Sequence, residues 1–390
     1  MSYFLFPKIP DNQLIDTLIF PCFDNDNSKK PSINKTLTYY LIKSKTEIDN
    51  RQIEWDRIKK FTNPYEFIHT VIPGMKTAIC RHLPLSRSYF KMIEICGLLN
   101  LLDDYVRPIN CFSLAEGPGG FIEALCEMRE NSKDKYYGMT LLRDDTSIPG
   151  WKKSKAFLIK YSNVYLENGD TEDGDILNEK NLIYCYKKYQ NSMDLITGDG
   201  GFDFSLDFNR QETVSSKLIF AQISFAIGMQ KIGGNFIIKF FDTFTKVSID
   251  MIYLLLNLYE NVYIMKPNTS RPANSEKYII CKNFRQKNTK ELIDKCCEIL
   301  KNLEYKNLAS LFNEELPYIY ISRLEELNAI LGQQQIENIT LTLNLIDNYK
   351  NDKLESIKKN NIQKCIVWCQ KYKLPYYKCS ITNNQFLYKE

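Results

Sequence analysis

The sequence predicts an α/β fold with a mostly parallel sheet and one antiparallel terminal strand, and two observations lead to this prediction. From residue 110 onward, short apolar runs alternate with helical segments, a pattern typical of a parallel sheet with helices on both faces. The last two apolar runs, 261–267 and 276–284, are separated only by "NTSRPANS". Because a parallel crossover needs about a dozen residues or more, these two strands are expected to pair antiparallel.

The individual elements follow from local patterns along the chain. Residues 86–102, "SRSYFKMIEICGLLNLL", have helical apolar spacing, and Ser86 is placed to cap this helix. A long helix at 210–232 is expected to end at Gly233 and Gly234, as helices often do. The other expected elements are strands at 111–115, 135–142, 163–168, 193–201 and 235–241, and helices at 120–129 and 247–259.

Length and composition limit the class of protein. The chain has 390 residues, of which 44% are hydrophobic, and this suits one large domain with extensions or two domains. We expect an irregular N-terminal lobe (1–80), a central domain (81–288) and a helical C-terminal extension (289–390). No run approaches the roughly 18 apolar residues of a membrane span, and the N-terminus lacks the pattern of a signal peptide.

The cysteines and histidines do not form a recognisable metal-binding pattern. Twelve cysteines are scattered along the chain, and the two histidines are His69 and His82. We therefore expect no metal site, and we expect reduced thiols in an intracellular protein.

Charge is unevenly distributed, although the net charge of +4 is too small to identify a partner. The segment from Tyr349 to Lys378 has eight lysines against two acidic residues, interleaved with aromatic residues such as Trp368. Such a mixture can follow phosphates and stack on bases. A solvated helix face with its aromatics packed inward explains the pattern equally well, and both interpretations stay open here.

A glycine-rich turn and four polar residues are candidates for a functional site. "SLAEGPGGFIEAL" (113–125) joins a predicted strand to a predicted helix, as turns that cradle nucleotide-like ligands do. Ligands of open α/β sheets bind beyond the carboxyl ends of the strands. Asp199 follows the apolar "LIT", Lys239 ends "NFIIK", and Glu276 opens the last strand, while Lys91 lies on the preceding helix.

Each of these four residues also has an ordinary structural explanation. An Asp-Gly-Gly sequence is often only a turn, and a lysine that ends a strand usually reaches solvent. A glutamate that opens a strand is usually exposed, and a lysine on an amphipathic helix usually lies on the surface. Only their joint occurrence, in this order, favours a shared function.

The order Lys, Asp, Lys, Glu resembles that of the FtsJ-type RNA 2′-O-methyltransferases, and the cap-specific mRNA (nucleoside-2′-O-)-methyltransferase branch in particular. That branch includes cellular cap-1 enzymes and proteins of large DNA viruses. The resemblance implies a Rossmann-like S-adenosylmethionine-dependent methyltransferase fold over roughly residues 86–285. The segments that carry it are "AEGPGGFIEAL", "YGMTL", "DGDI", "DGGFDF…NRQE", "GGNFIIKFFDTFT" and "KPNTSRPANSEKYIICKN".

The resemblance implies a role for each residue. Lys239 would be the general base, Lys91 and Glu276 would orient the hydroxyl and the lysine, and Asp199 would hold Lys239 near the methyl group. No metal would be required. The cofactor S-adenosylmethionine would be bound by the glycine turn and two acids, namely Ser113, Glu116, Gly117, Pro118, Gly119, Gly120, Phe121, Asp175 and Asp199. A ribose-binding acid is missing unless Asp144 or Asp145 supplies it.

RNA contacts are expected at the open end of the sheet. The candidates are Arg87, Asn209, Arg271, Asn274 and Ser275. For Arg271 to Ser275 the alternative is a tight hairpin set by Pro272 and Asn274, and Asn209 could instead cap the helix that follows it.

The sequence therefore predicts a methyltransferase that acts on the ribose 2′-hydroxyl of the first transcribed nucleotide of capped mRNA. The alternatives are an FtsJ-type enzyme for ribosomal or transfer RNA and a non-catalytic RNA-binding scaffold subunit. Capped mRNA is the expected partner, other capping or transcription proteins are further candidates, and no membrane is expected. The compartment would be the cytoplasm for a large DNA virus (its factory or virion) and the nucleus for a cell.

Overall fold

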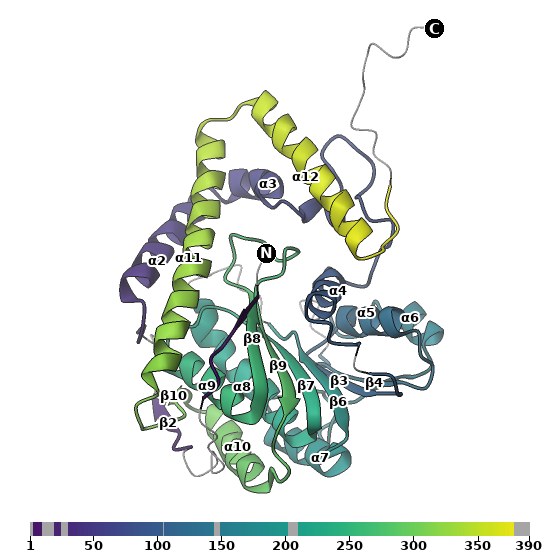
Figure 1. Ribbon diagram of the computed structural model, residues 1–390, viewed down its shortest axis with the longest axis vertical. Helices are drawn as coiled ribbons and strands as arrows, with labels where there is room; N and C mark the ends of the chain where they lie inside the picture. Colours follow the sequence, from purple (N-terminus) through teal and green to yellow (C-terminus); the bar gives the residue numbers. More distant parts are fainter. Residues whose placement is uncertain are drawn as a thin grey trace.

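The computed structural model describes residues 3–9, 19–24, 30–103, 105–143, 149–201 and 210–377. Within these ranges it confirms the α/β architecture, with an eight-stranded mixed sheet in the order β1-β8-β9-β7-β6-β3-β4-β5 (Figure 1). The strands of this sheet are β1 (Tyr3–Leu5), β3 (Asn110–Leu114), β4 (Lys135–Met139), β5 (Val164–Leu166), β6 (Met193–Gly198), β7 (Gln230–Phe240), β8 (Tyr259–Met265) and β9 (Lys277–Phe284).

The predicted antiparallel hairpin is present. Strands β3, β4, β5, β6 and β7 are parallel to one another. Strand β9 lies between β7 and β8 and is antiparallel to both, and in this register Lys239 on β7 is opposite Tyr278 on β9. The short β1 adds an antiparallel edge next to β8. The sequence did not predict β1, because three residues are too few to show a periodic pattern.

Helices cover both faces of the sheet, as apolar strands in a parallel sheet require (Figure 1). Helices α4 and α5 contribute to one hydrophobic cluster and helices α7 to α10 to the other. Helix α8 is buried along most of its length, which explains its nearly continuous apolar sequence. The bounds are α4 (Ser88–Leu99), α5 (Gly120–Arg129), α6 (Lys155–Lys160), α7 (Glu179–Tyr189), α8 (Gln211–Met229), α9 (Lys246–Leu258) and α10 (Lys290–Leu303).

Two helix boundaries differ from the prediction. Helix α8 ends at Met229 and the chain enters β7 directly, so that Gly233 and Gly234 lie within the strand. The buried side chain of Gln230 stabilises this junction, because its Nε2 donates to the carbonyl of Asn235 at 2.8 Å. Helix α4 begins at Ser88, and no side chain caps its N-terminus.

The flanks of the chain are more regular than the sequence indicated. The predicted irregular lobe contains helices α2 (Lys35–Asp49) and α3 (Gln52–Thr62), the turn η1 (Glu66–Ile68) and a strand, β2 (Cys22–Asp24), paired with β10 (Asn307–Ser310). The predicted C-terminal helices are α10, α11 (Tyr318–Asp347) and α12 (Asn351–Lys371). Helices α2 and α11 lie side by side (Figure 1).

Both flanks share hydrophobic cores with the sheet. Trp368 of α12 is buried, with its ring 5.9 Å from that of Phe90 on α4. Leu324 of α11 belongs to the cluster on the other face. Gly332 of α11 faces Leu37 of α2, where a Cβ atom would lie 2.9 Å from the leucine, so the helices approach closely at this glycine. The flanks are therefore packed against the central part of the chain.

Candidate active site

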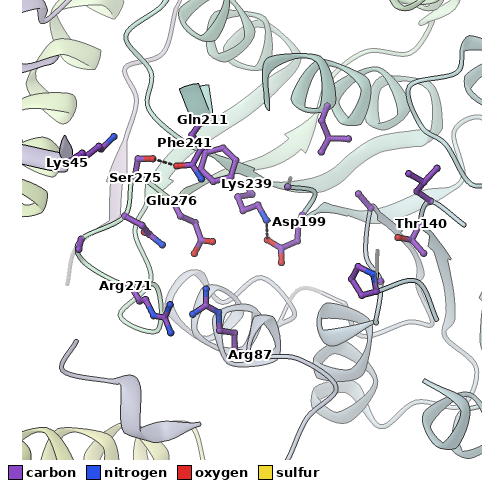
Figure 2. A pocket seen from close by; sticks show the side chains of 18 of the residues that line it. Lys45, Arg87, Thr140, Asp199, Gln211, Lys239, Phe241, Arg271, Ser275 and Glu276 are labelled. Carbon is purple, nitrogen blue, oxygen red and sulfur yellow. Dashed lines mark hydrogen bonds and ion pairs between the residues drawn. The ribbon is translucent and has the colours of Figure 1, made fainter. Parts of the chain in front are cut away.

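A cavity of about 810 Å³ lies at the carboxyl ends of β3, β4, β6 and β7, where ligands of open α/β sheets bind (Figure 2). The sheet contributes Thr140, Asp199 and Lys239 to its lining, and the segment before β9 contributes Glu276. The opposite wall comes from α2, α3 and α11, which are remote from the sheet in sequence.

Lys239 and Asp199 form the first ion pair of this cavity. Lys239 is the penultimate residue of β7 and Asp199 directly follows β6, so the parallel pairing of these strands brings the two residues together. The Lys239 Nζ lies 3.2 Å from the Asp199 Oδ1 and donates to the Asp199 carbonyl at 2.6 Å. The Tyr278 hydroxyl donates to the same Oδ1 at 2.7 Å, which fixes the carboxylate. No pattern in the sequence indicated a role for Tyr278.

Lys91 and Glu276 form the second ion pair. The Lys91 Nζ lies 2.7 Å from Oε1 and 2.8 Å from Oε2 of Glu276, and both side chains are buried. Burial lowers the pKa of Lys91, although Glu276 and Asp199 oppose this shift. Burial alone would raise the pKa of Glu276, but the nearby Lys91 and Lys239 hold it below its usual value. The cavity lining includes Glu276 but not Lys91, so Lys91 stands behind the carboxylate.

Lys266 fixes the loop that ends at Glu276. It is the residue after β8, and its Nζ donates to the carbonyls of Asn274 at 2.6 Å and Glu276 at 2.8 Å. It also donates to the Asn274 side chain at 2.9 Å. Burial lowers the pKa of Lys266 to about 7, against the effect of Glu276. The role of this lysine was not predicted, because nothing in a single sequence indicates that a lysine after a strand is buried.

The three glycines of the turn have different surroundings. Gly117 lines the cavity, whereas Gly119 and Gly120 face protein atoms. A Cβ atom on Gly120 would lie 2.2 Å from the Ser86 Oγ, and one on Gly119 would lie 3.3 Å from the Trp151 ring. These two glycines therefore make room for the start of α4 and for Trp151.

Four other predicted turn residues have structural partners. The Glu116 Oε1 accepts from the Phe121 backbone N–H at 2.6 Å, so this side chain caps helix α5. The Ser113 Oγ accepts from the Thr197 hydroxyl at 2.9 Å, Phe121 is fully buried, and the Pro118 carbonyl accepts from Ser154. The Glu116 Oε2 is buried and has no hydrogen-bond partner among the residues that the structure describes, and burial raises the pKa of this carboxyl to about 8.

The residues at the far end of the cavity fit the adenosine part of S-adenosylmethionine. The Asp175 Oδ1 accepts from the Leu177 N–H at 2.9 Å, while within the described part of the chain Oδ2 has an ion-pair contact with Arg143 at 3.7 Å. A carboxylate oxygen beside the apolar side chains of Leu141 and Ile176 suits an aromatic ring that carries an amino group. Asp144 and Asp145 lie outside the described residues.

The candidate RNA-binding residues gather at the mouth of the cavity. The Arg271 guanidinium binds the Glu66 carboxylate at 2.7 and 3.1 Å and faces the cavity beside Arg87 (Figure 2). Arg87 is exposed and forms no ion pair with any described residue. The Ser275 Oγ donates to Gln211 at 2.8 Å, and Asn274 also lines the cavity. Asn209 lies outside the described residues.

The opposite wall of the cavity was not predicted from the sequence. Helix α2 contributes Lys45, helix α3 contributes Trp55 and Lys59, and helix α11 contributes Gln335. The Gln335 Nε2 donates to the Ala273 carbonyl at 2.9 Å and so ties α11 to the loop before Glu276. Only tertiary packing brings these helices to the sheet, and no local sequence motif indicates that they line the cavity.

Comparison with known families identifies the central part of the chain. The FtsJ-like methyltransferase family matches residues 84–284, just over half of the sequence. The chain belongs to the FtsJ-like methyltransferase family. S-adenosylmethionine is accordingly its methyl donor.

Two relatives of this FtsJ-like methyltransferase share one name with each other. The cap-specific mRNA (nucleoside-2′-O-)-methyltransferase 1 of Ailuropoda melanoleuca is 32% identical over 243 residues, 60% of this chain and 28% of that protein. The enzyme of that name from Homo sapiens is 31% identical over 253 residues, which again cover 60% of this chain and 28% of that protein. The chain thus spans about 28% of the length of these relatives.

A solved structure is also similar to part of this chain. Human methyltransferase-like protein 13, in complex with SAH, is 12% identical with a TM-score of 0.33, covering 55% of this chain and 89% of that one. Among the described residues, no helix is both long and apolar enough to cross a membrane.

Proposed function

We propose that this FtsJ-like methyltransferase methylates the ribose 2′-hydroxyl of the first transcribed nucleotide of capped mRNA, which converts cap 0 to cap 1. The observation that carries the proposal is the pair of buried lysine–carboxylate contacts, Lys239 with Asp199 and Lys91 with Glu276, at one end of a single cavity. A ribose hydroxyl is a poor nucleophile until its proton is removed, so this reaction needs a base beside the hydroxyl.

In this proposal Lys239 is the base. S-adenosylmethionine supplies a methyl group on a positively charged sulfur, which is already activated for transfer. Lys239 in its neutral form accepts the proton of the hydroxyl, and the carboxylates of Asp199 and Glu276 compensate the positive charge that results. Lys91 acts through Glu276 as a positioning residue.

The other walls of the cavity support a substrate with phosphates and a base. Arg87, Arg271 and Lys59 bring positive charge to one cavity, as a capped 5′ end with its chain of phosphates would require. Trp55 adds an aromatic wall that suits a nucleobase. The name of the two relatives is the further support for a capped mRNA. Asp175 and Gly117 would hold the cofactor at the other end.

Methyl transfer from labelled S-adenosylmethionine to matched RNAs tests the proposal. Three RNAs of one sequence would carry an N7-methylated cap, an unmethylated cap or a 5′ triphosphate. We expect transfer to capped RNA, with the label on the ribose of the first nucleotide after nuclease digestion. Equal labelling of the uncapped RNA at internal positions would support the ribosomal or transfer RNA alternative.

A binding measurement separates the enzyme from the scaffold alternative. Isothermal titration with S-adenosylhomocysteine should show one binding site on the purified chain. No binding and no transfer to any RNA would contradict the proposal and favour a non-catalytic RNA-binding subunit.

A further inference from the structure

A second cluster of chemically active side chains lies outside the cavity. His82 precedes α4, and Glu123 and Glu127 are one turn apart on α5, so both carboxylates project from one face of that helix. The His82 Nε2 lies 3.8 Å from the Glu123 Oε1 and 3.6 Å from the Glu127 Oε2. The three ligand atoms all lie within 4.8 Å of one another.

The imidazole nitrogen of this cluster has two carboxylate neighbours but no hydrogen bond within the described residues. The His82 Nε2 is buried from solvent and makes no hydrogen bond within the described structure. Both carboxylate oxygens that face it are too far away for a hydrogen bond, whose donor–acceptor distance is about 3 Å. A buried polar atom without a partner is costly, so this arrangement is unfavourable unless something binds between the three atoms.

The two separations from His82 are close to those in the coordination sphere of a metal ion, and the two carboxylate oxygens lie within 4.8 Å of each other. Zn²⁺ binds histidine nitrogen and carboxylate oxygen at about 2.1 Å, and neighbouring ligands of a tetrahedron of that size lie about 3.4 Å apart. The distances of 3.6 and 3.8 Å are only slightly longer. We propose that His82, Glu123 and Glu127 bind a divalent transition metal ion of the Zn²⁺ class, with the fourth position open to water.

The surroundings hold the ligands in place. The Leu85 backbone N–H donates to the Glu123 Oε2 at 2.7 Å, which leaves Oε1 directed toward His82. The Tyr89 hydroxyl donates at 2.6 Å to the Glu127 Oε2, the oxygen that also faces His82, and the Tyr89 ring lies 4.7 Å from the imidazole ring. Such outer contacts orient the ligands of metal sites. Two carboxylates and a neutral imidazole also balance the charge of a divalent cation.

The site is accessible and links two important segments. The side chains of His82 and Glu127 are each 25% exposed, so an ion can reach the cluster from solvent. The ion would join the segment that leads to Arg87 and α4 onto α5, which follows the glycine turn. It therefore acts as a structural clip beside the cavity and takes no part in methyl transfer.

The sequence predicted no metal because known zinc patterns have closely spaced cysteines and histidines. Here one ligand comes from a loop and the other two from a helix further along the chain. Only the packing of α4 against α5 brings them together.

Titration of the metal-free full chain with Co²⁺, which takes the same geometry as Zn²⁺ and is coloured, tests the proposal. We expect one equivalent of Co²⁺ to bind with the visible bands of a four-coordinate site and without the near-ultraviolet band of a cobalt–thiolate bond. Zn²⁺ should displace it. His82→Ala and Glu127→Gln should each weaken binding about tenfold or more, whereas Glu130→Gln, on the exposed end of the same helix, should not.

Thermal melting provides an independent measurement. Zn²⁺ should raise the melting temperature of the wild type, because an ion that binds only the folded state stabilises it. This increase should be absent in Glu127→Gln, a nearly isosteric change that is expected to fold even if His82→Ala does not. No visible cobalt bands, a cobalt–thiolate band alone, or unchanged affinity in Glu127→Gln would each overturn the proposal.

Discussion

Lys91 and Glu276 lie 185 positions apart in the sequence and contact each other through both carboxylate oxygens, at 2.7 and 2.8 Å. Lys91 contacts the Glu276 carboxylate from the side away from the cavity. The other side of this carboxylate faces Lys239 and Asp199 across the cavity (Figure 2). The two lysines of the site are therefore not equivalent. Lys91 is held by its partner away from the cavity, and Lys239 is the lysine that a substrate can reach.

Replacing Lys239 should abolish most of the activity. Lys239→Ala is expected to lower methyl transfer at least about 100-fold, the usual effect of removing a general base. Its affinity for S-adenosylhomocysteine should stay close to that of the wild type, measured by isothermal titration. Lys287→Ala, at an exposed position after β9, is the matched control. A Lys239→Ala variant that keeps most of its activity would show that another residue is the base.

Gly201 leaves space for the base. A Cβ atom there would lie 3.1 Å from the Lys239 Nζ, and the backbone of Gly201 has no positive φ that would exclude alanine. Gly201→Ala should therefore shift the flexible end of Lys239 and lower kcat about tenfold or more, since small displacements of reacting groups are costly. The melting temperature should change little. Unchanged kcat would mean that Lys239 reaches the substrate by another route.

Glu66 should make the folded state sensitive to acid. Burial would raise its pKa, but Arg271 lowers it to about 2 from the usual 4.5. The Glu66 carboxyl thus binds its proton more tightly in the unfolded chain than in the folded one. The contribution of ionised Glu66 to the stability of the folded state is therefore complete above about pH 4.5 and is lost as the pH falls toward 2. The difference corresponds to about 3 kcal/mol in the free energy of unfolding.

Denaturant titrations of Glu66→Gln and the wild type at several pH values check this. The free energy of unfolding should fall less steeply in the variant between pH 4.5 and 2, and Glu54→Gln, an exposed change on α3, should follow the wild type. Parallel curves for Glu66→Gln and the wild type would contradict the role of the Glu66–Arg271 pair.

The basic segment at the C-terminus should contribute to RNA binding through its exposed lysines. Lys359, Lys364 and Lys371 are exposed on α12, whereas Lys358 donates to Glu355 at 2.6 Å. We plot the logarithm of the RNA-binding constant against the logarithm of the salt concentration. Replacing the three exposed lysines with glutamine should reduce the steepness of this plot by up to about 0.7 for each phosphate contact that is lost. Affinity for a capped dinucleotide should not change. Equal salt slopes for a long capped RNA would favour the solvated helix face.

The structure also bears on that alternative. Trp368 is only 3% exposed and packs on the core, so it is not available to stack on a base. Tyr349 and Tyr377 of the same segment are 49% and 42% exposed, so the structure removes only Trp368 from the aromatic side chains that could stack on a base.

The sheet and the residues at its carboxyl ends were predictable because both depend on local signals. Asp199 and Lys239 follow or end apolar runs, and parallel strands place such ends at one edge. The burial of Lys91 was not predictable, because an isolated lysine on an apolar helix is usually exposed. Its burial depends on Glu276, whose contact spans the fold.

The glycine turn shows a different limit of sequence reasoning. A run of glycines indicates close approach of the backbone, but it does not say to what. Gly119 has a φ of 108°, and it and Gly120 approach Trp151 and Ser86 of the protein itself. Far-wall residues such as Trp55 and Gln335 carry no signal, because their position results from packing between distant helices.

The contact between Gln335 and the Ala273 carbonyl has a consequence for the order in which the protein is made. The sheet with Asp199, Lys239 and Glu276 is complete before α11 is synthesised, but the wall that encloses it is not. On the ribosome, the nascent chain therefore passes through a stage in which the strands that carry these three residues have been made, but helix α11, which forms part of the opposite wall of the cavity, has not. Enclosure comes only when residue 335 has emerged from the exit tunnel, so the ability to hold a substrate is acquired late in translation.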